Sequence, residues 1–330
     1  MRAIMSIFVV VWHMGGVGRS LIFSKNHYLE HTFTVSDFVN FHMLLLAVPT
    51  FIFISNFLYA LGEVNNTTLR KRLKRILILL TFWPIALIIF LNGYHDLSKL
   101  LPHSLSSFAI IMLTAGGTIY YFFVSLIVCI LITHLIAKLT FRLQIFGFVL
   151  SIIFLASLPE LTRMLDFYPL SAFWSPLNFI PYPFAAVLIA KNIDCVRLNM
   201  KILMSASIVL FVLFSIFEWN YSVGEIFFPG QGYAIPAYTR TSLLFGVIAL
   251  ALVAIEPRIK SNGIIKYMAK YSLALYCLHP FLIEPVTRLT TKIVPNEMNV
   301  TYVSIILVIL FSYAIAAVLR IYYIKEEVIT

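Results

Sequence analysis

Apolar residues gather into ten segments along the chain, and shorter polar stretches separate them. The segments cover residues 3–23, 37–61, 76–93, 114–137, 143–158, 177–190, 202–219, 239–255, 268–287 and 300–324. A helix needs about 20 mainly apolar residues to cross the hydrocarbon core of a bilayer. The pattern therefore predicts an all-α fold, a polytopic bundle of about ten transmembrane helices. Pro181 and Pro183 predict a break or kink in the sixth segment.

The composition supports this interpretation and leaves no stretch for a soluble domain. The chain has 330 residues, of which 61% are hydrophobic and 12% charged, whereas soluble domains average about 25% charged residues. We therefore expect a single integral-membrane domain over residues 1–330. The net charge of +10 does not indicate a nucleic-acid partner, because the basic residues lie between apolar segments. The three cysteines are far apart and show no metal-binding spacing, so no metal site is expected.

The distribution of lysine and arginine predicts the orientation in the membrane. These residues concentrate in loops that face the cytoplasm. With the N-terminus inside, the inner connections carry most of the 24 basic residues, so both termini are predicted to be cytoplasmic. The outer loops hold aromatic residues such as Trp174 and Trp219 beside carboxylates such as Glu160 and Glu218. Such aromatics are either interfacial anchors or part of a sugar-binding surface.

The first segment carries two ionisable residues, Arg2 and His13, eleven positions apart. Eleven helical steps return to within about 20° of the same face, roughly 16 Å along the axis. Both side chains therefore face one side of the bundle, along a stripe with Ser6 and Val9. An ionisable group at membrane depth is a functional candidate, and imidazole exchanges protons near neutral pH. As alternatives to a functional role, His13 could be a packed, neutral histidine and Arg2 could only set the topology. The segment could also be a cleaved signal peptide, but no clear A-x-A cleavage site follows it.

A basic cluster, "RKRLKR", occupies residues 70–75. Arg72 and Arg75 are three positions apart and so share one helix face. Guanidinium groups bind phosphate through paired, fixed donors, so the pair could hold a polyphosphate at the cytoplasmic end of a helix. Positive-inside anchoring and contact with anionic lipids are the alternative explanations.

A third candidate stretch is "YSLALYCLHPFLIEPV" in the ninth segment. It places His279 within the predicted span, followed by Pro280, which should break or kink the helix and free backbone groups. His279 and Glu284 are candidates to line one cavity. The alternative is a packed histidine with its hydrogen bonds satisfied.

Taken together, these motifs resemble the acyltransferase 3 family of bacterial membrane proteins. Members carry a basic residue and a histidine in the first span, which match Arg2 and His13 in "RAIMSIFVVVWH". An R-x-x-R after the second span matches Arg72 and Arg75, "FIFISNFLY" is similar to "FFxxSGF", and "YSLALYCLH" is similar to "YSLYLxH" and ends at His279. "YYFF" at residues 120–123 is a looser match to a "WFL"-like stretch. Asn56 stands where the family usually has glycine, and the short lead before the arginine is missing.

The resemblance implies O-acylation, usually O-acetylation, of sugars in surface polysaccharides or lipid-linked glycans. It implies acetyl-CoA as the donor, with no permanently bound cofactor, and a place in the bacterial cytoplasmic (inner) membrane. The expected partners are acetyl-CoA, a glycan or lipid-linked sugar and membrane lipids. Arg72 and Arg75 would bind the CoA phosphates, and the pantetheine arm would follow the stripe from Arg2 to His13.

His13 would then act as general base or acyl carrier, and His279 would orient it or donate to the oxyanion. Two rival functions remain open from the sequence. A transporter or flippase for a lipid-linked sugar also suits ten spans with central histidines. A non-catalytic partner in a polysaccharide assembly complex would keep the motifs for folding alone.

Overall fold

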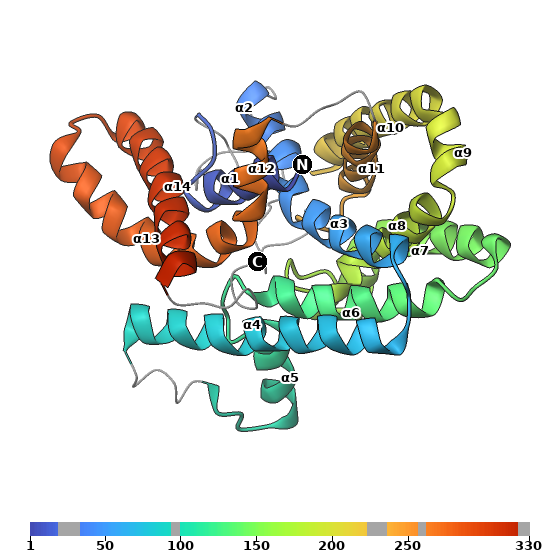
Figure 1. The fold of residues 1–330 in the computed structure, drawn as a ribbon, viewed down its shortest axis with the longest axis horizontal. Coiled ribbons are helices and arrows are strands. Elements are labelled where there is room, and N and C mark those ends of the chain that lie inside the picture. The colour runs from blue at the N-terminus through green and yellow to red at the C-terminus, as the bar shows by residue number, and fades with distance from the viewer. Residues whose placement is uncertain (19–33, 94–99, 223–235, 257–261, 323–330) are drawn as a thin grey trace. The chain divides into compact units, whose positions relative to one another are not determined.

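A computed structural model of the chain describes residues 1–18, 34–93, 100–222, 236–256 and 262–322. These residues are mainly helical, with no strand among them, as the apolar pattern predicts (Figure 1). Each of the ten predicted segments contains a main helix. These are α1 (Arg2–His13), α3 (Ala47–Leu61), α4 (Asn66–Asn92), α6 (Tyr121–Ile136), α7 (Phe141–Leu165), α8 (Pro181–Lys191), α10 (Met200–Ser222), α11 (Thr241–Ile255), α13 (Ser272–Ile293) and α14 (Glu297–Tyr322).

Shorter helices complete the described part of the chain. They are α2 (Val35–Phe38), η2 (Val39–Met43), η3 (Leu44–Leu46), α5 (Leu105–Leu113), η5 (Tyr168–Leu170), η6 (Pro176–Phe179), α9 (Ile193–Leu198) and α12 (Gly263–Lys270). The first three continue into α3 without interruption, so Val35–Leu61 forms one apolar span of 27 residues.

Five helical segments in the described ranges are long and apolar enough to cross a membrane. They are Val35–Leu61, Asn66–Asn92, Phe141–Leu165, Met200–Glu218 and Asn299–Leu319. Large apolar side chains are exposed along several of them, including Phe82, Phe146 and Phe217. Exposed apolar surface of this kind suits contact with lipid. The chain is therefore an integral membrane protein, while the count of about ten spans and the cytoplasmic termini stay predictions.

Two local predictions need correction. The first apolar segment does not continue to residue 23, because α1 ends at His13 and is followed by Gly15 and Gly16 at φ values of +95° and +77°. Glycine adopts this left-handed backbone without strain, so the two glycines stop the helix. His13 thus lies at the end of a short helix, not near the middle of a span; residues 19–23 lie outside the described ranges.

The prolines confirm one prediction and correct another. The sixth segment is broken just before Pro181, because η6 ends at Phe179 and α8 begins at Pro181, where the missing N–H costs no hydrogen bond. Pro280 and Pro285 lie inside α13, which is continuous from Ser272 to Ile293. Pro280 still frees one backbone carbonyl, that of Tyr276 four residues earlier.

The backbone contacts divide the chain into two compact units, each described here by itself. Unit 1 comprises residues 1–18, 73–124 and 261–330, and unit 2 comprises residues 19–72 and 125–260. The division falls inside α4 and again inside α6. That the whole chain is one membrane domain stays a prediction.

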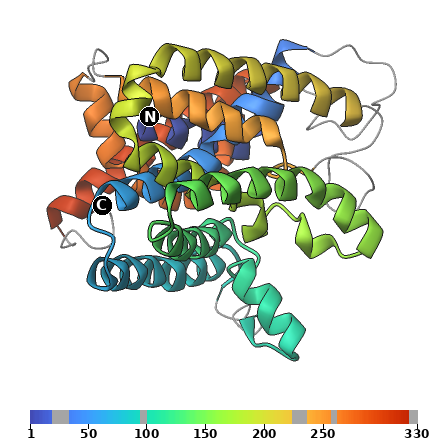
Figure 2. The same cartoon turned by 90° about the vertical axis from the view of Figure 1, so that its right-hand side faces the viewer.

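In unit 1, α13 and α14 pack side by side as an antiparallel pair (Figures 1 and 2). Helix α1 packs against α12, α13 and α14. Two reciprocal hydrogen bonds tie α13 to the segment just before α6: the Tyr120 hydroxyl donates to the Cys277 carbonyl at 2.6 Å, and the Tyr276 hydroxyl donates to the Ile119 carbonyl at 2.6 Å. The surroundings of α13 near His279 are therefore held at two points.

In unit 2, α10 packs against α11 and α3 packs against α8. Gly246 on α11 permits close approach, because a Cβ there would lie 2.7 Å from Leu46 Cδ2 and 3.0 Å from Phe211 Cδ2. The α3–α6 contact has a polar component, since Thr133 Oγ1 donates to Asn56 Oδ1 at 2.6 Å. Asn56, which stands where the resembled family has glycine, thus joins two helices through its amide.

Candidate active site

The stripe predicted along α1 has a buried middle and exposed ends. Ser6 is fully buried and Val9 is 3% exposed, while Arg2 and His13 keep exposed surface. Only the middle of the stripe, at Ser6 and Val9, therefore faces the interior of unit 1. Its two ionisable residues remain accessible at the two ends of one short helix.

The structure brings His13 and His279 together. Their ring centroids are 5.2 Å apart, with an angle of 43° between the planes. The two residues are 266 positions apart in the chain, and the packing of α1 against α13 places them side by side. The two candidate histidines thus form one site in unit 1.

The hydrogen bonds of His279 fix its tautomer. Its side chain is fully buried, and its Nδ1 lies 3.2 Å from the Leu275 carbonyl oxygen. The Tyr276 carbonyl, freed by Pro280, is a second backbone acceptor for the same ring. A carbonyl only accepts hydrogen bonds, so Nδ1 carries the proton and Nε2 carries a lone pair. No described residue hydrogen-bonds this Nε2.

Two tyrosines lie near His279 on or against α13, and their sequence alone did not mark them as site residues. The Tyr276 ring centroid is 5.9 Å from that of His279, and Tyr120 lies 6.1 Å from Tyr276. Tyr120 is fully buried. Both belong to stretches quoted for the family resemblance, "YYFF" and "YSLALYCLH", which was the available signal. They hold the helix that carries His279 and leave its Nε2 open.

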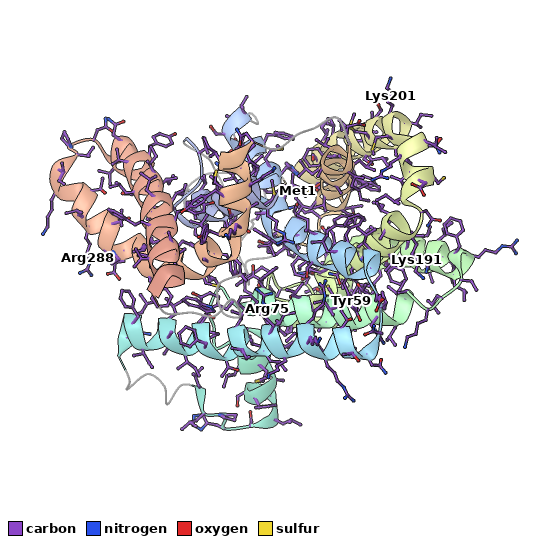
Figure 3. The ribbon with its side chains drawn as sticks, viewed as in Figure 1. Met1, Tyr59, Arg75, Lys191, Lys201 and Arg288 are labelled. Carbon is purple, nitrogen blue, oxygen red and sulfur yellow. The ribbon has the colours of Figure 1, made fainter. Side chains whose placement is uncertain are left out.

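Glu284 does not share the site. It pairs with Arg288 one turn later on α13, and both side chains are more than half exposed. Arg288 points away from α13 toward the outside (Figure 3). The expectation that His279 and Glu284 line one cavity is therefore wrong, because five helical steps place them on different faces.

The five residues of the basic cluster differ in how far they are buried. Arg72 and Arg75 are partly buried, whereas Arg70, Lys71 and Lys74 are exposed. All five lie within α4, so the arginine pair does share a helix, as predicted. Within this cluster, the two motif arginines are therefore the ones that pack against the protein.

The two motif arginines have their contacts in different units. In unit 1, the charges of Arg75 on α4 and Arg2 on α1 repel each other. In unit 2, Arg72 donates to the Ser55 carbonyl at 3.3 Å, and its guanidinium carbon lies 5.0 Å from the centre of the Tyr59 ring. Unit 1 therefore gathers Arg2, His13, Arg75 and His279, and Arg72 alone belongs to unit 2.

A helical membrane protein with a paired histidine and a cationic cluster has the parts needed for group transfer from an anionic donor. The comparison with known families makes the class specific: the chain belongs to the acyltransferase 3 family, whose model, described as an acyltransferase domain, matches residues 1–320. The protein is thus a membrane acyltransferase. No curated protein and no solved structure matched the chain.

Proposed function

We propose that the protein moves an acetyl group from cytosolic acetyl-CoA to a sugar hydroxyl of a surface polysaccharide or lipid-linked glycan, in the bacterial inner membrane. The observation that carries this proposal is the His13–His279 pair in unit 1. His279 has a fixed tautomer and a lone pair on Nε2 without a hydrogen-bond partner among the described residues, and His13 has exposed surface. Such a pair can accept and return a proton during acyl transfer.

The tautomer of His279 suggests how the pair divides the work. The open Nε2 faces the His13 ring as its neighbour; during the reaction it would accept the N–H of His13, and the other ring nitrogen of His13 would carry a lone pair toward the substrate. In this arrangement His13 is the catalytic base and His279 is the group that orients it. A neutral His279 has no N–H at Nε2 to donate, so the geometry supports orientation of His13 over donation to an oxyanion.

The chemical step then follows from the base. His13 takes the proton of the acceptor hydroxyl as its oxygen attacks the carbonyl carbon of the thioester. The carbon–sulfur bond breaks, and the CoA thiolate receives the proton from His13. General-base help of this kind contributes roughly 10²–10⁴ in rate. In the alternative with an acyl-histidine, the same nitrogen of His13 first takes the acyl group and then passes it to the hydroxyl.

The arginines are proposed to bind the donor phosphates. Arg2 and Arg75 repel each other in unit 1, and an anion between two such cations turns the repulsion into two charge-assisted contacts. Arg2 and His13 stand at opposite ends of α1. A donor whose phosphates lie near Arg2 and whose thioester lies near His13 would therefore extend along this helix.

The test uses membranes that contain the protein and measures CoA released from acetyl-CoA. His13→Ala should lower the release at least about 100-fold at unchanged protein level. His103→Ala is the matched control, because His103 is exposed and outside the site. A flippase would release no CoA in the wild type, and a scaffold would lose the glycan mark only when the protein level falls. The mass of the surface glycan with and without the gene product identifies the acyl group.

A further inference from the structure

A buried tyrosine and histidine pair next to Arg72 is not explained by the mechanism above. Tyr59, which projects from α3 (Figure 3), is 1% exposed, and His134 on α6 is 6% exposed. The Tyr59 hydroxyl and His134 Nδ1 share a hydrogen bond of 2.8 Å. The two rings are nearly parallel, 15° apart, with centroids at 6.3 Å. The pair therefore fixes the Tyr59 ring in one orientation.

Arg72 rests on this ring. Its guanidinium carbon lies 5.0 Å from the Tyr59 ring centre, and its Nη1 donates to the Ser55 carbonyl at 3.3 Å. Ser55 and Tyr59 are one helical turn apart, so both contacts come from the same face of α3. A free arginine side chain loses rotamer entropy when it binds a ligand. An arginine already held by a carbonyl and a ring has less to lose when it binds an anion.

The α3–α6 contact does not need the Tyr59–His134 hydrogen bond to exist. The two helices are already joined one turn earlier, where Thr133 donates to Asn56 at 2.6 Å and Asn56 donates to the Ile52 carbonyl at 2.7 Å. The second bond is the one whose ring carries Arg72. This difference separates a bond that joins helices from a bond that orients an arginine.

We propose that Tyr59 and His134 are positioning residues for Arg72, and that in unit 2 they hold its guanidinium in the orientation in which it binds a phosphate of the donor. The proposal rests on the proposed function, because it takes the donor to be a phosphate-bearing thioester. The two arginines of the R-x-x-R motif then have different roles. Arg75 interacts with Arg2, and Arg72 binds phosphate from an orientation that Tyr59 and His134 set.

The experiment compares Tyr59→Phe, His134→Leu and the double variant in purified full-length protein. Tyr59→Phe keeps the ring under Arg72 but removes the hydroxyl that His134 holds. Affinity for CoA, the KM for acetyl-CoA and kcat are measured together with thermal stability. We expect KM and the Kd for CoA to rise about 3- to 10-fold in all three variants, with kcat within about twofold of the wild type.

The double variant separates positioning from stability. Each single variant leaves one buried polar atom without its partner, whereas the double variant removes both, so it should regain stability. A positioning role predicts that KM stays raised in the double variant. If KM returns to the wild-type value as stability returns, or never rises, the pair is only structural and the proposal is overturned.

Thr133→Val is the matched control. It breaks the other polar contact between the same two helices, so it should lower stability and leave KM and Kd unchanged. An equal rise in KM in this variant would contradict the assignment to Tyr59 and His134. A wild type that releases no CoA would instead overturn the proposed function itself, which is a different result from an active wild type whose KM ignores Tyr59.

Discussion

Unit 2 holds two arginines against the same span, Val35–Leu61, and they differ in exposure. Arg240 donates to the Phe41 carbonyl and lies 3.2 Å from the centre of the Phe41 ring. Arg72 makes the same two kinds of contact with Ser55 and Tyr59. Phe41 and Tyr59 are about 27 Å apart along a helix. Arg240 is fully buried, whereas Arg72 is only partly buried.

The surroundings of Arg240 explain its burial. Glu218 is 3% exposed and interacts with the charge of Arg240. It accepts a hydrogen bond from the Ser242 backbone at 2.9 Å and one from the Ser242 hydroxyl at 2.5 Å, so it also satisfies donors at the start of α11. A charge enclosed by such a network serves the fold, while an arginine with open surface can receive a ligand. If Arg72 binds the donor as proposed, exposure, more than contact type, separates this arginine from the structural Arg240.

The largest expected effect is on stability, at the enclosed arginine. Arg240→Ala should destabilise the fold by about 3–5 kcal/mol, because it leaves Glu218 buried without its opposite charge. Protein level in the membrane and thermal unfolding in detergent measure this loss. The double change Arg240→Met with Glu218→Gln should recover much of the stability. An Arg240→Ala protein of wild-type stability would break the comparison.

The next effect is on donor binding, at the partly buried arginine. Arg72→Ala should raise the KM for acetyl-CoA about 10- to 100-fold, because a charge-assisted phosphate contact is lost. Its melting temperature should stay close to the wild type, in contrast to Arg240→Ala. Steady-state kinetics on membranes with matched protein levels give the answer. An unchanged KM would remove Arg72 from the donor site.

The smallest effect is expected at an exposed member of the basic cluster. Lys71→Ala should change the KM for acetyl-CoA by less than a factor of two and the free energy of unfolding by less than about 0.5 kcal/mol. Surface charges away from special features have such small effects. The same kinetic and thermal measurements apply. A rise in KM equal to that of Arg72→Ala would show that the total positive charge of the cluster, and not Arg72 in particular, binds the donor.

For unit 1, the sequence identified the candidate residues better than it predicted the local structure around them. The pairing of Arg2 with His13 follows from helical periodicity, and the match to known motifs pointed to His279. The length of α1 was predicted wrongly, because hydrophobicity continues past His13 while the backbone at Gly15 and Gly16 turns left-handed. Periodicity does not register such a stop, although two adjacent glycines were the available signal.

The contacts of unit 2 could not be predicted from one sequence. Tyr59 and His134 are 75 residues apart, and no local pattern links them. The burial of Arg240 likewise depends on Glu218 and Phe41 from other helices. Long-range polar pairs arise from how helices pack, and this information does not reside in any one segment.

The most direct test of the central claim is a double-mutant cycle between His13 and His279, measured as CoA release from acetyl-CoA. If His279 acts through His13, each alanine variant should lose at least about 100-fold, and the double variant should lose little more than His13→Ala alone. Independent losses that multiply in the double variant, at unchanged protein level, would contradict a paired histidine site.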